Sequence, residues 1–171
     1  MSLNKTPLNA AHRAAGARMV DFGGWDMPVS YGSQIDEHHA VHRDAGMFDV
    51  SHMRVVDVHG DGARAFLRYA LANNVDKLKA PGKALYSWLL EQHGFVVDDL
   101  IVYELARERY LLIVNAANRE PDVAWLRDRE VEGAEVRDVS DDYGLIAVQG
   151  PRSLERLGLP EAPAFTFADG E

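Results

Sequence analysis

The sequence of 171 residues contains no cysteine, and this absence removes several kinds of chemistry at once. Without thiols the chain forms no disulfide, no zinc–thiolate site and no cysteine nucleophile. Such a composition fits a reducing compartment, so we expect a cytoplasmic protein. The alanine-rich start does not read as a secretory signal, because His12, Arg13 and Arg18 interrupt it before a continuous apolar segment forms.

Long apolar runs and an excess of positive charge are missing as well. No stretch of the sequence approaches the roughly 20 apolar residues that cross a bilayer, so we expect no membrane association. The chain carries 18 Lys and Arg against 27 Asp and Glu, a formal net charge of −9. A chain of this charge without a local basic stripe repels phosphate backbones, and we therefore expect no nucleic-acid partner.

The composition that remains is that of a folded globular domain. Hydrophobic residues make up 47% and charged residues 26% of the chain, which is ordinary for a globular protein. We find no internal repeat and no low-complexity segment, and we expect one domain over residues 1–152. Residues 153–171 are proline-rich and weakly patterned beyond Leu157, so we expect the start of a following segment or a truncated tail.

Helix signals occur early in the chain. The first 32 residues, with Gly23 and Gly24, predict a short helix followed by extended or looped chain. Ser33 is suited to cap a helix that runs to about Arg43. Asp61 is suited to cap another, because an apolar stripe with helical spacing follows it. The residues of this stripe are Ala63, Phe66, Leu67, Ala70 and Leu71.

Strand signals are concentrated in the middle and later parts of the chain. The expected strands are Val55–Val58, Ala84–Leu90, Phe95–Glu104, Tyr110–Val114, Glu135–Arg137 and Leu145–Gln149. The connection Gln92–Gly94 is typical of a hairpin, and a helix is expected over Glu120–Arg129. Since antiparallel-looking strands are interleaved with helices, the sequence predicts the α+β class, an antiparallel sheet with flanking helices.

The first candidate site is a group of three histidines, His38, His39 and His42. On a helix His38 and His42 share a face, a spacing that suits a metal ion. Glu37 precedes the first histidine, whereas the glutamate of zinc peptidases follows it. Because spacing alone is weak evidence, we favour uncoordinated histidines and expect no metal.

The second candidate is the run Phe48–Met53, in which Asp49, Ser51 and His52 lie close together. Members of a catalytic triad converge from distant parts of a chain, because each holds a separate position around one reacting atom. Neighbours in a row diverge instead. We therefore favour a structural turn, with a wall facing a ligand as a third interpretation.

The third candidate is the pair Asp98 and Asp99, which interrupts an otherwise apolar strand. Side chains alternate along a strand, so Asp99 shares a face with Ile101 and Tyr103, and Asp98 points to the opposite face. Aspartate is depleted in strands, and an unpartnered buried carboxylate is costly. Two such residues in succession indicate either a functional site, or a bulge or strand end where both acids reach solvent or cap neighbouring N–H groups. The residues alone leave both interpretations open.

The fourth candidate is the pair Asn115 and Asn118, directly after the strand Tyr110–Val114. Asparagine at a strand end can hydrogen-bond a polar heterocycle. Asn118 is better interpreted as the cap of the following helix, while the role of Asn115 stays open.

Taken in order, these segments resemble the T-protein family of the glycine cleavage system. The matching pieces are Thr6–Leu8, Gly16–Trp25, Met27–Pro28, Tyr31, Gly46–Met53, Gly82–Ser87, Asp98–Tyr103, Val114–Asn118 and Ala147–Pro151. Together they cover the chain almost continuously from Thr6 to Arg152, and the bacterial members are most similar, notably over Tyr31–Ala40.

The resemblance implies a fold and a reaction. The antiparallel sheet with its helices would form the first part of a three-domain, ring-like molecule, with residues 1–152 as an N-terminal folate-binding and catalytic domain. The enzyme would be a cytoplasmic bacterial aminomethyltransferase that needs no metal. It would transfer the aminomethyl group from the lipoyl arm of H-protein to tetrahydrofolate, releasing ammonia and 5,10-methylenetetrahydrofolate.

The same resemblance implies roles for individual residues. Asp99 matches the acidic residue that contacts the pterin and assists its attack on the aminomethyl carbon, whereas we expect Asp98 to be structural. Met53, Tyr86, Tyr103 and Asn115 match positions that line the folate cavity.

The chain departs from the family in length. It covers less than half of a full T-protein and lacks the downstream Glu and Arg residues of the folate site, so we expect a fragment without full activity. Two alternatives share the fold, a folate-dependent demethylase and a folate-binding accessory protein for iron–sulfur assembly. The net negative charge does not fit an acidic partner such as H-protein, because like charges repel. Attraction would have to come from local basic patches or from the missing half of the protein.

Overall fold

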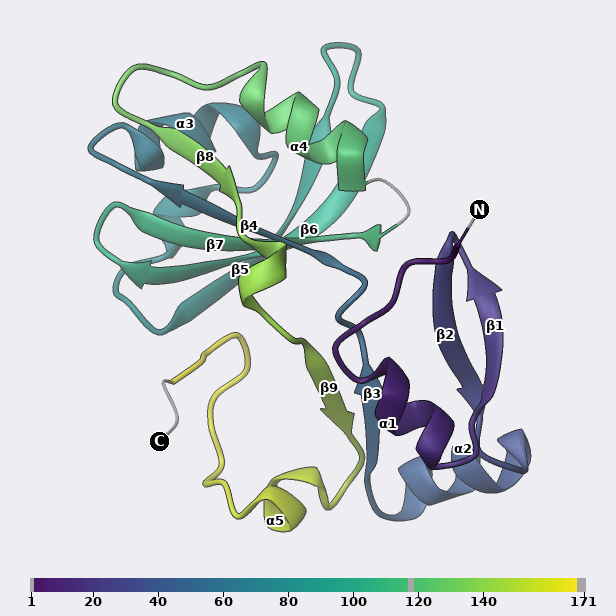
Figure 1. Ribbon diagram of the computed structural model, residues 1–171. Coiled ribbons are helices and arrows are strands. Elements are labelled where there is room, and N and C mark those ends of the chain that lie inside the picture. Colours follow the sequence, from purple (N-terminus) through teal and green to yellow (C-terminus); the bar gives the residue numbers. More distant parts are fainter. Residues whose placement is uncertain (1, 117–118, 169–171) are drawn as a thin grey trace. The chain divides into compact units, whose positions relative to one another are not determined.

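The computed structural model describes residues 2–116 and 119–168, and the chain divides into two compact units. Unit 1 comprises Met1–His52 and Tyr143–Glu161, and unit 2 comprises Met53–Asp142 and Ala162–Glu171. Helices and antiparallel strands occur in both units (Figure 1), which confirms the predicted α+β class.

Unit 2 is built on a five-stranded antiparallel sheet with the order β5-β6-β7-β4-β8. Its strands are β4 (Arg54–His59), β5 (Lys83–Leu90), β6 (Val96–Ala106), β7 (Arg109–Val114) and β8 (Glu135–Asp138). Strand β6 carries the Asp98–Asp99 pair and lies between β5 and β7, so both of its edges are hydrogen-bonded. The tight turn from β5 to β6 uses Gly94 at φ 85°, a conformation that glycine adopts without strain.

One face of this sheet is covered by two helices, α3 (Ala63–Ala70) and α4 (Arg119–Arg127), as Figure 1 shows. We call it the core face. The apolar stripe predicted on α3 is buried there, because its spacing places every member on the side that meets the sheet. The largest side chains with almost no exposure on this face include Phe66, Leu67, Leu89, Leu100, Leu112, Leu126 and Val102. The opposite side of the sheet, which carries Asp99, Ile101 and Tyr103, is called the second face.

Unit 1 combines two small antiparallel sheets with three short helices. Its elements are α1 (Asn9–Ala14), β1 (Arg18–Phe22), β2 (Trp25–Ser30), α2 (Gln34–Arg43), β3 (Gly46–Asp49), β9 (Ile146–Gln149) and α5 (Ser153–Leu157). Strands β1 and β2 form a hairpin, and β3 pairs with β9 across about a hundred positions of sequence. The pairing of β3 with β9 joins the two ends of the unit.

Most of the expected helices and strands are confirmed within a few residues. Ser33 caps α2 as predicted, and its Oγ accepts a hydrogen bond from the Asp36 N–H at 3.2 Å. The prediction that Asp61 caps α3 is wrong, because Gly62 occupies the cap position. The N–H of Gly62 donates to the Gly133 carbonyl at 2.8 Å, so a backbone contact serves this helix end in place of a side chain.

Candidate functional site

Burial alternates along β6 and separates its two aspartates. Asp98 is 8% exposed and lies on the core face with Leu100 and Val102. Asp99 is half-buried and lies on the second face with Ile101 and Tyr103. The predicted division of the two carboxylates between opposite faces is confirmed. Asp98 is buried and Asp99 is half-buried, so the part of the alternative in which both acids reach solvent is wrong. The part in which an acid caps a neighbouring N–H holds for Asp98, whose Oδ1 accepts the Asp99 N–H at 2.8 Å beside a register shift between Leu89 and Leu90.

Asn115 links the two aspartates. Its side-chain Nδ2 lies 2.9 Å from Oδ1 of Asp98, 3.1 Å from the backbone oxygen of Asp99 and 3.3 Å from Oδ1 of Asp99. Oδ1 of Asp98 also accepts the Asp99 N–H at 2.8 Å. The sequence left the role of Asn115 open, and the structure brings it together with both acids.

Two aromatic side chains of β5 accompany Asp99 on the second face. Trp88 pairs directly with Asp99 in the sheet register, and Tyr86 pairs with Ile101. The rings of Tyr86 and Trp88 meet edge to face at 5.2 Å. A hydrogen bond to Asp99 is the main cause that raises the pKa of the Tyr86 phenol, because ionisation would place two negative charges together.

Sequence reasoning named Tyr86 but missed Trp88. The signal was available, because Trp88 stands two positions after Tyr86 in a predicted strand and must share its face. An exposed tryptophan and tyrosine beside a carboxylate form a surface suited to a flat polar ligand.

Tyr103 and Met53 lie at the edges of this group. Tyr103 is on the second face but four register positions away from Asp99, and the centre of its ring lies 5.5 Å from that of Phe167. Burial raises the pKa of its phenol. Met53 directly precedes β4, whose first residue Arg54 pairs with Val114, so the same register continued by one position brings Met53 level with Asn115.

Behind the site, on the core face, lies an acid that sequence reasoning missed. Asp122 of α4 is 0% exposed and hydrogen-bonds to Asp98. Burial, then the hydrogen bond with Asp98 and the nearby Asp98 and Asp99 charges, raise its pKa to about 8. An aspartate in the first turns of a helix is ordinary in sequence, so no local signal marks it.

The run Phe48–Met53 does not bring Asp49, Ser51 and His52 together as a triad. Phe48 and Asp49 end β3, while Ser51 and His52 lie in a turn. The Ser51 N–H donates to Oδ1 of Asp49 at 2.9 Å, and Oγ of Ser51 lies 3.0 Å from the Leu145 N–H. The favoured structural turn is therefore confirmed for the second half of the run.

Asp49 instead contacts a histidine from a distant helix. Nε2 of His12 lies 2.9 Å from Oδ2 of Asp49, and Nδ1 of the same ring lies 2.5 Å from the Tyr31 hydroxyl. The Asp49 side chain is fully buried. This chain of contacts was not predicted, because 37 positions separate His12 from Asp49.

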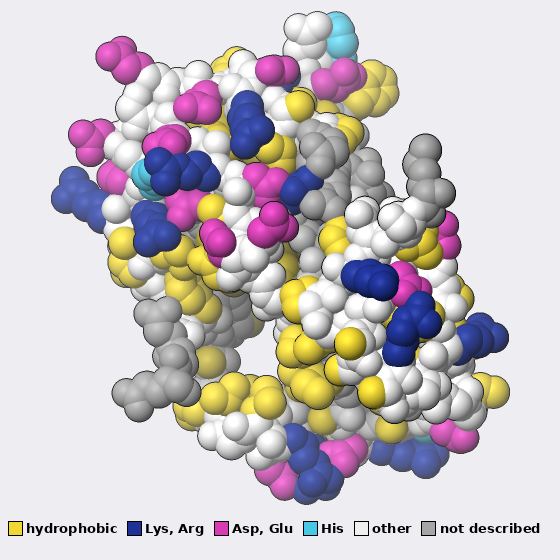
Figure 2. All heavy atoms as spheres, viewed as in Figure 1, with side chains coloured by type: hydrophobic (Ala, Val, Ile, Leu, Met, Phe, Trp, Pro, Cys, Tyr) yellow, Lys and Arg dark blue, Asp and Glu magenta, His cyan; other side chains and the backbone are white. Residues whose placement is uncertain are grey.

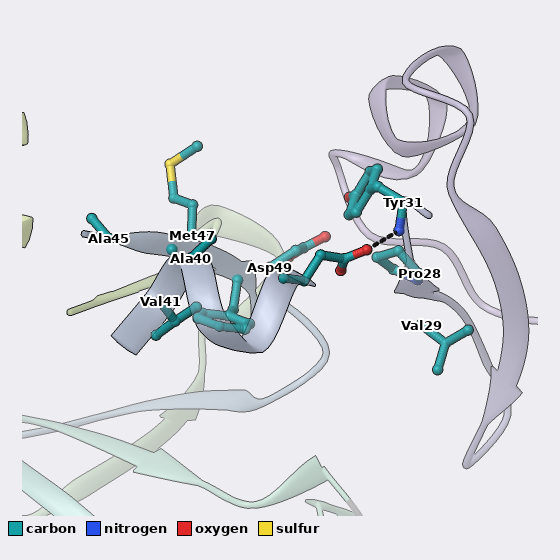
Figure 3. A pocket seen from close by; sticks show the side chains of 11 residues that line it. Pro28, Val29, Tyr31, Ala40, Val41, Ala45, Met47 and Asp49 are labelled. Atoms are coloured by element: carbon teal, nitrogen blue, oxygen red, sulfur yellow. Dashed lines mark hydrogen bonds between the residues drawn. The ribbon is translucent and has the colours of Figure 1, made fainter. Parts of the chain in front are cut away.

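A cavity of about 290 Å³ lies beside this chain of contacts in unit 1, between β2, α2 and β3 (Figure 3). Its lining is mostly apolar, with the Tyr31 ring at one end (Figure 3), and it also includes Glu37. Oε1 of Glu37 accepts the Tyr31 N–H at 2.7 Å. None of the five residues predicted to bind folate or act in catalysis lines this cavity.

The histidine group on α2 keeps the spacing that the sequence indicated. The rings of His38 and His42 lie 4.4 Å apart. Over residues 2–116 and 119–168, no group of three His, Cys, Asp or Glu side chains is arranged to hold a metal ion. Asn118, predicted to cap α4, lies outside the described residues.

Surface charge is mixed in sign. On the face drawn in Figure 2, acidic and basic side chains are interspersed within each unit. Ion pairs such as Arg109–Asp57 at 2.9 Å and Arg156–Asp44 at 2.6 Å account for part of this pattern. None of the helices within the described ranges has the length and hydrophobicity that a membrane span requires.

Comparison with known proteins assigns the family. Residues 8–159 match the model of the GCVT N-terminal domain, and the chain belongs to this family. An aminomethyltransferase of Cupriavidus taiwanensis is 60% identical over 168 residues, which cover 92% of this chain and 45% of that protein. An aminomethyltransferase of Burkholderia multivorans is 56% identical over 169 residues, covering 96% of this chain and 45% of that protein.

A solved structure shares the fold. The glycine cleavage system aminomethyltransferase T from Bartonella henselae superposes with a TM-score of 0.86 at 38% identity, covering 94% of this chain and 45% of that one. The predicted resemblance to the T-protein family is thereby confirmed. The chain spans less than half the length of these relatives.

Proposed function

We propose that this chain supplies the folate-binding and catalytic portion, residues 1–152, of an aminomethyltransferase of the glycine cleavage system. The substrates are tetrahydrofolate and the aminomethyl group on the lipoyl arm of H-protein. The products are 5,10-methylenetetrahydrofolate, ammonia and dihydrolipoyl H-protein. The relatives named aminomethyltransferase support this proposal, but they are more than twice as long as the matched segment.

The observation that carries the proposal is the placement of Asp99. Its carboxylate lies half-buried on the second face, with hydrogen-bond donors from Tyr86 and Asn115 and with Trp88 beside it in the register. Aromatic surfaces bind a flat heterocycle, and a few polar groups fix its orientation. Met53 and Tyr103 extend this binding surface at its two ends.

Asp99 is suited to the chemistry of aminomethyl transfer. A carboxylate beside the pterin orients the folate and stabilises positive charge that develops as ammonia leaves. The hydrogen-bond donors Tyr86 and Asn115 hold this carboxylate in place. Asp99 is therefore proposed as the catalytic residue, and Met53, Tyr86, Tyr103 and Asn115 as folate-binding residues.

The surrounding assignments follow from the same proposal. Each step is proton and carbon transfer between organic groups, so no metal is assigned to the site. The enzyme works in the bacterial cytoplasm with lipoylated H-protein as its partner. The mixed surface charge offers basic side chains for an acidic partner in spite of the net charge of −9.

The test uses the complete protein with tetrahydrofolate and aminomethyl-loaded H-protein. Formation of 5,10-methylenetetrahydrofolate and ammonia in equal amounts is expected. H-protein without the lipoyl group is the matched control and gives no product. No product from the loaded H-protein would contradict the proposed function.

A further inference from the structure

Two buried carboxyl groups meet behind the site. Asp122 of α4 and Asp98 of β6 are 0% and 8% exposed and hydrogen-bond to each other. Among the described residues, no group donates a hydrogen bond to either oxygen of Asp122. A carboxylate is only an acceptor, so two carboxyl groups form a hydrogen bond only when one of them carries a proton. The contact therefore holds a proton.

The surroundings decide which residue carries it. Asp98 already accepts the Asp99 N–H at 2.8 Å and Nδ2 of Asn115 at 2.9 Å, and such donors favour an ionised carboxylate. Within the described part of the chain, Asp122 has no comparable donor. Burial and the charges of Asp98 and Asp99 raise the pKa of Asp122 to about 8. Asp122 is therefore the donor at neutral pH.

The ionised Asp98 in turn fixes the amide of Asn115. One terminal atom of this amide lies within 3.3 Å of three oxygens, which are Oδ1 of Asp98 and both the backbone oxygen and Oδ1 of Asp99. Only nitrogen is favourable among three acceptors, so Nδ2 occupies that position. Oδ1 of Asn115 then lies at the other end of the amide as an acceptor.

We propose that Asp122 is a positioning residue, which donates to Asp98 and through Asp98 holds the Asn115 amide so that Asn115 and Asp99 both present acceptors to the ligand. Such a pair of acceptors selects a flat heterocycle with neighbouring N–H donors. This rests on the proposed function, because the pterin of tetrahydrofolate is such a heterocycle. Asp122 itself touches neither ligand nor reacting atoms.

The proposal predicts a pH dependence of binding. The ionisable groups that act on Asp122 from the neighbouring strand are Asp98 and Asp99. When Asp122 loses its proton above about pH 8, two buried carboxylates repel each other and the hydrogen bond from Asp122 to Asp98 is lost. This repulsion displaces the Asp98 carboxylate from the Asn115 amide that it holds at 2.9 Å, so the KM for folate rises while kcat changes little.

The proton on Asp122 also makes the free energy of unfolding depend on pH, and this free energy falls as the pH rises. The pKa of Asp122 is raised from 3.8 in the unfolded chain to about 8 in the folded one. Its contribution to stability is therefore fully present below about pH 4 and is lost as the pH rises toward 8. Asp122→Asn removes this dependence.

The test compares three variants of the complete protein. Asp122→Asn keeps an N–H donor toward Asp98 and cannot ionise, Asp122→Ala removes the donor, and Asp128→Asn changes an exposed aspartate just after α4 as the matched control. We expect the KM for tetrahydrofolate to rise about 5- to 10-fold in Asp122→Ala, a loss typical of one hydrogen bond to a charged group. We expect Asp122→Asn to stay within about twofold of the wild type and to lose the alkaline rise in KM.

A readout independent of catalysis follows the Asn115 side-chain amide by NMR. In the wild type and in Asp128→Asn its signals shift with a midpoint near pH 8, and in Asp122→Asn they do not. The proposal would be overturned if the Asn115 amide signals did not change with pH in the wild type. It would also be overturned if they shifted with the same midpoint in Asp122→Asn. Should Asp122→Ala fail to fold, the Asp122→Asn comparison decides alone. If the wild type shows the amide titration but forms no methylenetetrahydrofolate, the proposed function is contradicted. The role of Asp122 in positioning Asn115 through Asp98 would still be supported.

Discussion

The hydroxyl of Tyr86 and the carboxylate of Asp99 are hydrogen-bonded across two adjacent strands, two register positions apart on the same face of the sheet. This bond connects the aromatic surface of β5 with the acid of β6. It also accounts for the raised pKa of the phenol. The orientation of Asp99 thus depends on groups from two neighbouring strands, since Asn115 contacts it from the other side.

The first prediction concerns this hydrogen bond. Tyr86→Phe removes the donor to Asp99 but keeps the ring, so we expect turnover to fall about fivefold, the equivalent of ~1 kcal/mol for a typical hydrogen bond. Steady-state kinetics with saturating H-protein measure the effect. Tyr69→Phe, on an exposed side chain of α3, is the control and leaves the rate unchanged. A rate equal to that of the wild type in Tyr86→Phe would show that the bond does not orient Asp99.

The second prediction concerns the core of unit 2. Phe66 of α3 is completely buried between the helix and the sheet. Phe66→Ala leaves a cavity, and we expect it to lower the free energy of unfolding by about 3–5 kcal/mol. Denaturant unfolding measures the loss. Tyr69→Ala, one turn further on the exposed side of the same helix, should change stability by less than about 0.5 kcal/mol.

The third prediction concerns the close approach of two glycines. Gly60 has φ 109°, and a Cβ added there lies 2.2 Å from the Gly133 carbonyl oxygen. Gly94 has φ 85° but open space around the same position. Both alanine substitutions incur the strain of positive φ, so the difference between them isolates the backbone clash. We expect Gly60→Ala to be less stable than Gly94→Ala by at least about 2 kcal/mol, and equal stabilities would show that the two backbones do not approach this closely.

Local pattern predicted the placement of Asp99. Side chains alternate along any strand, so Asp98 and Asp99 are assigned to opposite faces as soon as the strand is identified. The apolar stripe of α3 was predictable for the same kind of reason. The same alternation along β5 would have predicted that Trp88 lies on the face of Tyr86.

Contacts between distant segments were not predictable from one sequence. The pairing of β3 with β9 and the contact of His12 with Asp49 depend on segments that meet only in the folded chain. Asp122 meets Asp98 because α4 packs on the core face, and nothing within its own helix marks it. Local rules assign a residue to a face, but they do not say which residue of another element it meets.

The central claim is that Asp99 acts in the chemistry while Asp98 supports the site from the core face. The most direct measurement is kcat of Asp99→Asn and Asp98→Asn in the complete protein, together with the midpoint of thermal unfolding of each. We predict that Asp99→Asn lowers kcat by about 100-fold or more, as loss of an acid–base group does, with little change in unfolding. Asp98→Asn should instead lower the unfolding midpoint and keep kcat within about tenfold of the wild type, since a buried hydrogen-bonded group chiefly affects stability. The reverse pattern, with kcat lost in Asp98→Asn and kept in Asp99→Asn, would contradict this account.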